Sequence, residues 1–136
     1  MPAREYLASV SNCVRQLNTL DWIIVNDGEI ETVRRESDVK PAHSDPTAAQ
    51  AMVRVARLDY AMHARLDLVE RIGACGMLIY KLGNELGSVY AQILEHRYID
   101  LWEWSLIADV TGVPERTCYA RRDYACDWID ENGWLY

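Results

Sequence analysis

The sequence predicts an all-α protein, with an N-terminal antiparallel helical hairpin followed by a C-terminal helix-turn-helix. Two long segments repeat their apolar residues at gaps of three and four, which is the spacing of one face of a helix. Helix breakers are few, because the 136 residues include only four prolines and seven glycines. The last third of the chain divides into shorter apolar segments that are separated by glycine and proline.

The first predicted helix runs from about Arg4 to about Glu36. Asn26-Asp27-Gly28 is its weak point, where the helix could kink or stop. A loop is expected from Ser37 to Pro46, because this stretch is rich in turn-forming residues and contains two prolines. The apolar face of the helix consists of Leu7, Val10, Val14, Leu17, Leu20, Ile23 or Ile24, Ile30 and Val33.

The second predicted helix starts at Ser44-Asp45-Pro46-Thr47, which combines a capping side chain with a proline near the first turn. It extends to about Lys81, and its apolar positions approach a heptad repeat, which is typical of a long helix packed along another. We therefore expect residues 1–83 to form an antiparallel hairpin and to make a homodimer through it, in coiled-coil fashion. The heptad positions are Val55, Leu58, Met62, Leu66, Val69, Ile72, Gly76 and Ile79.

Residues 84–136 are predicted to form a second domain, the helix-turn-helix. Asp100-Leu101 breaks its first helix, and Gly112 follows the second, as glycine often does at helix C-termini. Pro114 stands where a further helix can begin. The three expected helices span residues 88–99, 102–110 and 115–131.

Composition and motifs exclude several classes of function. The start of the chain lacks the apolar region of a signal peptide, and no apolar run approaches the roughly 18 residues of a membrane span. A soluble, cytoplasmic protein is therefore expected. The four cysteines form no CxxC pair and no histidine stands at ligand spacing from them, so we expect buried thiols, no metal and no other cofactor. Without a Gly-rich phosphate loop or a paired nucleophile and base, we expect a non-enzyme.

Three short motifs follow one another in the C-terminal domain. They read Ile-Leu-Glu-x-Arg-Tyr-Ile at 93–99, Trp-x-x-Ile-Ala at 104–108 and Gly-Val-Pro-Glu-x-Thr-x-Tyr at 112–119. In this order they resemble phage and prophage regulators of the RinA and ArpU type, whose C-terminal helix-turn-helix is like the fourth region of sigma factors. The resemblance implies a phage or mobile-element transcriptional regulator that binds double-stranded promoter DNA in the bacterial cytoplasm, alongside host RNA polymerase.

The last helix is expected to read the DNA, because the second helix of a helix-turn-helix enters the major groove. Cys118, Ala125 and Ile129 define the face that packs on the preceding helix. Arg116 or Arg122 could then contact a guanine bidentately. Tyr119 could contact a phosphate or a thymine methyl, and Thr117 the DNA backbone. The candidate DNA-binding residues are Arg116, Thr117, Tyr119, Arg121 and Arg122.

The charge of this domain opposes DNA binding. Residues 84–136 contain four basic and ten acidic residues, and they contribute −6 to the net charge of −7. Neutralisation of phosphates by Lys and Arg supplies nearly all non-specific DNA affinity. Where the similar regulators usually carry Lys and Arg, this helix ends in an acidic row of Asp123, Asp127, Asp130 and Glu131. The alternative function is a phage protein whose acidic row binds a host complex, either a polymerase subunit or a nucleic-acid-binding defence complex, as anti-CRISPR proteins do.

The tryptophans are expected to supply the aromatic bulk of the C-terminal domain. Trp102, Trp104 and Trp128 should form its small core. Trp134-Leu135-Tyr136 either docks on that core or is exposed as a hook for a partner.

Overall fold

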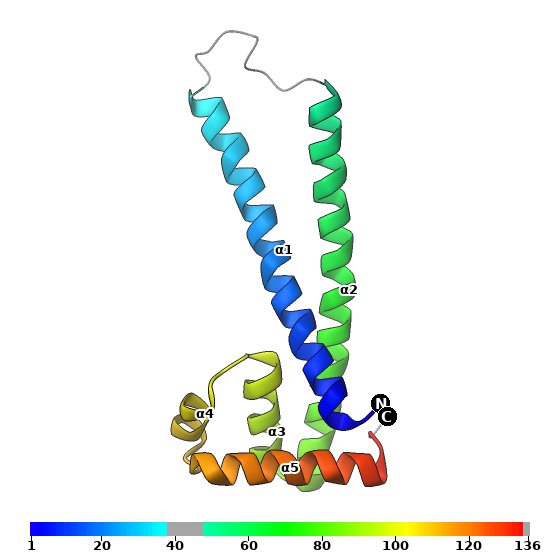
Figure 1. Cartoon of the computed structure of the whole chain (residues 1–136), viewed down its shortest axis with the longest axis vertical. Coiled ribbons are helices and arrows are strands. Elements are labelled where there is room, and N and C mark those ends of the chain that lie inside the picture. The colour runs from blue at the N-terminus through cyan, green and yellow to red at the C-terminus, as the bar shows by residue number, and fades with distance from the viewer. Residues whose placement is uncertain (38–47, 135–136) are drawn as a thin grey trace. The chain divides into compact units, whose positions relative to one another are not determined.

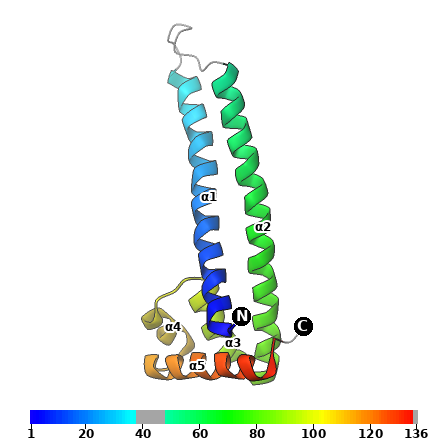
Figure 2. The same cartoon turned by 45° about the vertical axis from the view of Figure 1, so that its right-hand side comes forward.

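The computed structural model describes the backbone of residues 1–37 and 48–134 and the side chains of residues 1–26 and 48–134. Every element in these stretches is helical, which confirms the all-α prediction (Figures 1 and 2). Among them, no helix is both long and apolar enough to cross a membrane. The elements are α1 (Ala3–Ser37), α2 (Ala48–Leu86), α3 (Ser88–Leu94), the π-helical turn η2 (Glu95–Ile99), α4 (Trp104–Thr111) and α5 (Glu115–Asn132).

α1, α4 and α5 begin and end within about two residues of where the sequence places them, whereas α2 runs to Leu86, past its predicted end at about Lys81. α1 runs without a break through Asn26-Asp27-Gly28, so the expected weak point does not interrupt it. A glycine inside a helix costs only about 1 kcal/mol relative to alanine, which a helix of 35 residues tolerates. The expected helix start at Ser44-Asp45-Pro46-Thr47 lies outside the described residues, as does nearly all of the expected loop before it.

By their contacts the residues group into two units. One unit comprises Met1–Val14 and Glu70–Tyr136, and the other comprises Arg15–Val69. The first unit therefore joins the start of α1 and the last part of α2 to α3, η2, α4 and α5. The functional division between residues 1–83 and 84–136 stays a prediction.

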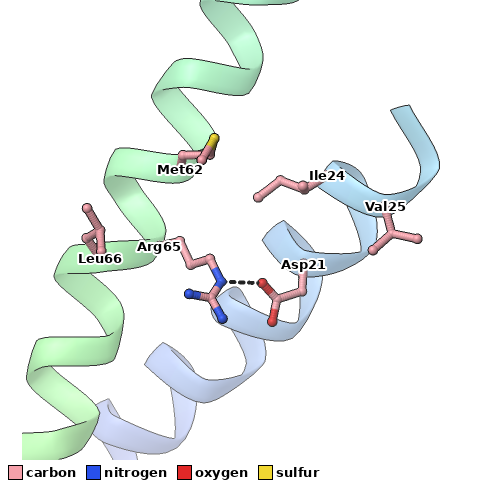
Figure 3. Close-up of a pocket in the computed structure, with 6 residues that line it drawn as sticks. All are labelled: Asp21, Ile24, Val25, Met62, Arg65 and Leu66. Carbon is pink, nitrogen blue, oxygen red and sulfur yellow. Dashed lines mark hydrogen bonds and ion pairs between the residues drawn. The ribbon is translucent and has the colours of Figure 1, made fainter. Parts of the chain in front are cut away.

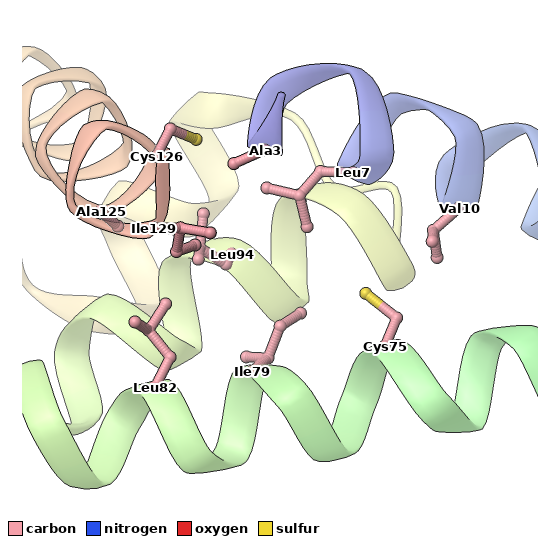
Figure 4. Packing of buried hydrophobic residues seen from close by; sticks show 10 residues of the cluster. All are labelled: Ala3, Leu7, Val10, Cys75, Ile79, Leu82, Leu94, Ala125, Cys126 and Ile129. Atoms are coloured by element: carbon pink, nitrogen blue, oxygen red, sulfur yellow. The ribbon is translucent and has the colours of Figure 1, made fainter. Parts of the chain in front are cut away.

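The main core of the first unit unites four helices (Figure 4). The first turns of α1 lie against the last part of α2, and α3 and α5 close the cluster. Each fully buried Leu or Ile here stabilises the fold by about 1.5–3 kcal/mol. The buried members are Ala3, Leu7, Val10, Cys75, Ile79, Leu82, Leu94, Ala125, Cys126 and Ile129.

A close approach of α2 to α3 supports this core. A Cβ added at Gly83 of α2 would lie 2.8 Å from the Cβ of Ala91 in α3, which is too short for two carbon atoms. Only glycine lets the two helices pack at this distance. Trp134 packs against the same core, and its ring centroid lies 5.2 Å from that of Tyr6. Of the two alternatives for the C-terminal residues, docking is therefore observed for Trp134, on the main core, whereas Leu135 and Tyr136 lie outside the described residues.

A second, smaller cluster joins α3, α4 and α5. Its buried members are Ile93, Ile107 and Cys118, one from each helix. Trp102 and Trp104 pack around them as predicted, while Trp128 packs against the main core instead. Cys118, Ala125 and Ile129 are all buried, as predicted. Only Cys118 packs with the preceding helix α4, whereas Ala125 and Ile129 pack in the main core, because α1 and α2 cover that part of α5.

In the second unit, the buried positions of α2 differ from the predicted heptad. Ala61 and Leu68 are buried, whereas Met62 and Val69 are exposed. The predicted heptad is therefore wrong over this part of α2, and the buried seam is displaced by one residue. The reason is that α2 carries two apolar stripes, which lie about 100° apart around the helix. Periodicity alone could not tell which of them packs inside the chain.

Candidate nucleic-acid interface

A tight turn joins α4 to α5. Gly112 ends α4 in the left-handed conformation, with φ 71°, and its N–H donates to the carbonyl of Ala108 at 2.9 Å. Glycine adopts this conformation without strain, and it commonly ends helices in this way. Pro114 caps α5, and its carbonyl accepts from the N–H of Cys118 at 2.9 Å. Because Cys118 and Ile107 share one buried cluster, the two helices are held in a fixed relation.

The first turns of α5 present two of the predicted DNA-binding side chains to solvent. Arg116 and Tyr119 are exposed, and Thr117 is half-buried. Arg116 makes no hydrogen bond or ion pair with any described residue. The Tyr119 hydroxyl donates to Oε1 of Glu115 at 2.5 Å, and this hydrogen bond raises the pKa of Tyr119. Tyr119 is therefore a neutral hydrogen-bonding group at physiological pH.

Two arginines stack on the ring of Trp104, beside the exposed start of α5. The Cζ of Arg97 lies 4.9 Å from the Trp104 ring centroid, and that of Arg122 lies 5.1 Å from it. Tyr119 meets the same ring edge-on, with centroids 4.8 Å apart. Stacking of guanidinium groups on tryptophan stabilises such clusters by about 0.5–2 kcal/mol per pair. Tyr119 and Arg122, both predicted from the sequence, are thus brought together around Trp104.

Arg122 is already engaged inside the chain. Its Nε donates to Asp123 at 2.7 Å, and its Nη1 lies 3.5 Å from the hydroxyl of Tyr98. Burial acts to lower the pKa of Arg122, but the interactions with Tyr98 and Asp123 outweigh it and raise the pKa. Arg122 is therefore a positioned cation within the cluster, unlike the exposed Arg116.

Arg121 points elsewhere. Its Cζ lies 5.3 Å from the ring centroid of Tyr90 in α3, and its buried Nε has no hydrogen-bond partner within the described residues. The structure therefore does not bring Arg121 together with Tyr119 and Arg122 at Trp104. This residue contributes to the contact between α3 and α5.

The acidic row of α5 faces the start of α1. Nη2 and Nη1 of Arg4 lie 3.5 Å and 3.2 Å from the carboxylates of Asp123 and Asp127. The backbone N–H of Ala3 donates to Oδ1 of Asp130 at 2.8 Å. A carboxylate at a helix N-terminus is stabilised by the helix dipole as well as by the hydrogen bond. Three of the four acidic residues thus have partners inside the chain, and Glu131 is exposed.

Arg4 and Arg97 are site residues that the sequence analysis did not assign. Arg4 lies more than a hundred residues from its partners in α5, and no pattern in the sequence connects them. Arg97 belongs to one of the three motifs, and its Nη1 also donates to the carbonyl of Trp102 at 3.0 Å. Its place in the motif could have identified it from the sequence, because an arginine close to a tryptophan of the next motif is a candidate for cation–π stacking.

The π-helical turn η2 sets the position of the two tryptophans. His96 stacks on Trp102 with centroids 4.1 Å apart and an interplanar angle of 6°, and its Nδ1 lies 2.7 Å from Oδ2 of Asp100. Leu101 follows with a left-handed φ of 59°, which is uncommon for a residue other than glycine. The predicted break at Asp100-Leu101 is thus confirmed. Short π-helical stretches occur frequently at functional sites.

The thiols belong to the core. Cys75, Cys118 and Cys126 are buried, Cys13 is half-buried, and all four are free. Burial raises the pKa of Cys75 and of Cys126 to about 11, so both stay protonated and are poor nucleophiles. Across the described residues, no group of three or more His, Cys, Asp or Glu side chains is arranged to hold a metal ion. No family model, curated protein or solved structure matches this chain.

Proposed function

We propose that this chain is a DNA-binding transcriptional regulator of a phage or mobile element, and that it inserts the start of α5 into the major groove. The observation that carries the proposal is the exposure of Arg116 and Tyr119 on the helix that follows a three-residue turn after α4. A short turn that contains a glycine is typical of a helix-turn-helix and supports this proposal. The resemblance of the three C-terminal motifs to RinA- and ArpU-type regulators supports the same function.

The distribution of charge along α5 reduces the repulsion of DNA that the net charge of residues 84–136 predicts. Apart from Glu115 in the first turn, the acidic residues of α5 begin at Asp123, and Arg4 and the N-terminus of α1 offset Asp123, Asp127 and Asp130. The three arginines of α5 and Tyr119 all precede Asp123. A DNA backbone that approaches the first turns therefore meets Arg116 before it meets the acidic row.

Each predicted residue then has a role that its environment suits. Arg116 is exposed and can contact a guanine bidentately, while Tyr119 can donate to a phosphate once its hydroxyl proton turns away from Glu115. Thr117, at the first turn, contacts the DNA backbone. Arg122, held on Trp104, supplies a fixed positive charge next to Tyr119. Arg121 positions α5 against α3 through Tyr90.

The test is a pair of arginine variants. Arg116→Ala removes the proposed guanine contact, and a bidentate contact of this kind discriminates by about 1–3 kcal/mol, or roughly 5- to 150-fold in affinity. Arg57→Ala removes the same charge from an exposed position of α2 and serves as the matched control. We expect Arg116→Ala to lose affinity for the bound sequence and Arg57→Ala to retain it. Equal affinity of the two variants would show that α5 does not read the DNA.

The proposed setting is the cytoplasm of a bacterial host, where the regulator would act beside RNA polymerase. This part of the proposal rests on the resemblance alone. A complex of the chain with polymerase on a promoter fragment, detected by a footprint larger than that of either protein, would support it. Footprints that never overlap on such a fragment would contradict it.

A second function has one observation in its favour. The Asp127 side chain keeps 63% of its surface exposed beside Arg4, and Glu131 is exposed one turn further on. These two carboxylates could bind a basic groove of a host protein complex. Reversal of both to lysine would abolish that binding, whereas it would strengthen DNA binding under the first proposal. The contacts of Asp123 and Asp130 within the chain favour the first proposal.

A further inference from the structure

One carboxylate stands among the residues that the start of α5 exposes. Glu115 lies in the first turn of α5, next to Arg116 and one helical turn before Tyr119. Within the described part of the chain, its side chain makes no ion pair and accepts a hydrogen bond only from the Tyr119 hydroxyl. Because a carboxylate repels phosphates, its presence on this surface points to a hydrogen-bond donor on the DNA bases.

An ion pair in the second unit shows what Glu115 lacks. Asp21 of α1 accepts from Nε of Arg65 in α2 at 2.7 Å, in a groove that is otherwise lined by apolar side chains (Figure 3). There a guanidinium offsets the negative charge of the carboxylate. The hydroxyl of Tyr119 is a neutral donor and leaves the charge of Glu115 in place. Glu115 can therefore accept a further hydrogen bond.

The four bases differ in what they offer to a carboxylate in the major groove. Cytosine presents its N4 amino group, which donates, and glutamate and aspartate side chains recognise cytosine through this group. Guanine presents two acceptors, and thymine presents an acceptor and a methyl group. Adenine has an amino group but places the acceptor N7 beside it, which repels a carboxylate. A carboxylate on the reading face of a helix therefore favours cytosine.

We propose that Glu115 selects a cytosine by accepting a hydrogen bond from its N4 amino group, and that this contact releases the Tyr119 hydroxyl to a phosphate. The inference rests on the proposed DNA binding by α5 and deepens it, because it names a base that the helix selects. In the free chain, the Tyr119 hydroxyl donates to Oε1 of Glu115 at 2.5 Å. On DNA, the cytosine amino group takes the place of that donor, and the hydroxyl donates to a phosphate oxygen instead.

The surroundings of Tyr119 suit this exchange. Its ring packs edge-on against Trp104, with centroids 4.8 Å apart, so the ring keeps its place while the hydroxyl proton turns. Arg97 and Arg122 stack on the same Trp104 ring. The hydrogen bond to Glu115 raises the pKa of Tyr119, and the charges of the two arginines act on the same hydroxyl in the opposite direction. Two cations therefore lie near the hydroxyl and attract the phosphate to which it donates.

Guanine and thymine do not support the exchange. If the Tyr119 proton turns to a phosphate beside one of these bases, the Glu115 carboxylate loses its donor and faces an acceptor, O6 of guanine or O4 of thymine. If the proton stays on Glu115, the phosphate contact is not made. Cytosine alone provides a donor that satisfies the carboxylate and frees the hydroxyl. The base contact and the phosphate contact are thus coupled through one hydroxyl group.

The experiment selects bound duplexes from a random pool and then titrates the selected site with every base at each position. For the wild type we expect a position where replacement of cytosine weakens binding by roughly 5- to 150-fold, the cost of one mismatched base pair. Glu115→Gln should lose this preference and favour adenine, because an amide side chain pairs with N6 and N7 of adenine. The matched control is Glu131→Gln, which removes the same charge from an exposed position in the last turn of α5 and should keep the preference.

A modified duplex tests the atom itself. Pyrimidin-2-one in place of the selected cytosine lacks only the N4 amino group. It should bind the wild type as weakly as a mismatched base does, and it should bind Glu115→Ala as tightly as cytosine does. The first of these measurements uses the wild-type chain, so it does not depend on whether a variant folds. Tyr119→Phe should weaken binding to the selected site several-fold and leave cytosine the preferred base.

The outcomes separate this inference from the proposed function. A wild-type chain that binds no duplex would overturn the proposed DNA binding and the inference with it. Selective binding in which Glu115→Gln keeps every base preference of the wild type would overturn the inference alone. Equal wild-type affinity for cytosine and pyrimidin-2-one would do the same. A Tyr119→Phe variant that no longer prefers cytosine would show that Tyr119, and not Glu115, reads the base.

Discussion

Arg4 in the first turn of α1 forms an ion pair with Asp127 of α5, with Nη1 and Oδ1 3.2 Å apart, although 123 residues separate them in the sequence. The same guanidinium reaches Asp123. The charge of α5 is therefore set partly by a segment from the other end of the chain. The net charge of residues 84–136 alone therefore overstates the negative charge that α5 presents to solvent.

The first prediction concerns this cation. Arg4→Ala should lower DNA affinity several-fold, because Asp127 then repels phosphates without a neighbouring positive charge and Asp123 keeps only Arg122. Stability should change by less than about 1 kcal/mol, since exposed ion pairs contribute little. DNA titration and urea unfolding measure the two effects. Arg15→Ala, which removes the same charge further along α1, should leave affinity unchanged. A similar loss in both variants would show a general charge effect.

Two glycines of α2 should respond to alanine in opposite ways. Gly83→Ala places a Cβ 2.8 Å from the Cβ of Ala91 and should destabilise the fold by about 1–3 kcal/mol. Gly73→Ala meets no atom within 4 Å and should stabilise it by about 0.4–1 kcal/mol. Urea unfolding of the two variants measures whether each substitution lowers or raises the free energy of unfolding. A stabilised Gly83→Ala variant would disprove the close packing of α2 on α3.

Two of the three arginines of α5, Arg116 and Arg122, should differ in what they contribute to stability. Arg122→Ala removes the stacking on Trp104 and should reduce the free energy of unfolding by about 1–2 kcal/mol. Arg116→Ala alters an exposed side chain and should change it by no more than about 0.5 kcal/mol. Thermal unfolding of both variants tests the difference. Equal losses would show that Arg122 is not engaged as described.

The buried thiols predict a loss of stability at alkaline pH. The pKa values of Cys75 and Cys126 rise from 9.0 to about 11 on folding. Between these values the unfolded chain has released the thiol protons and the folded chain has kept them. The resulting stability is therefore fully present below pH 9 and is lost as the pH rises toward 11. Urea unfolding across this range should show a steeper decline for the wild type than for a Cys75→Ala and Cys126→Ala variant. Parallel curves would contradict the burial of these thiols.

The helices could be predicted from the sequence because their signals are local. Apolar spacing, Gly112 and Pro114 fix the limits of α4 and α5 to within about two residues. The packing face of α5 also followed from spacing, since Cys118, Ala125 and Ile129 recur on one side. These features need no knowledge of distant parts of the chain.

The site was less predictable from the sequence. Some of its contacts join residues far apart in the chain, and others could be made equally well by either of two neighbouring residues. Nothing in the sequence connects Arg4 to the acidic row. Arg121 and Arg122 are adjacent, and only the positions of Tyr90 and Trp104 decide that they stack on different rings. α2 has two apolar stripes, and either could pack against α1. The periodicity of the sequence does not show which of the two is buried.

The central claim is that the start of α5 binds DNA, and a salt titration of the wild-type chain tests it most directly. Random duplexes and fragments from the protein's own genomic neighbourhood would be titrated at about 50 and about 200 mM salt. For three or four phosphate contacts we predict selective binding that weakens by roughly 40- to 150-fold between the two conditions. An absence of binding to every fragment at the lower salt concentration would contradict the claim and would make the acidic row the functional surface.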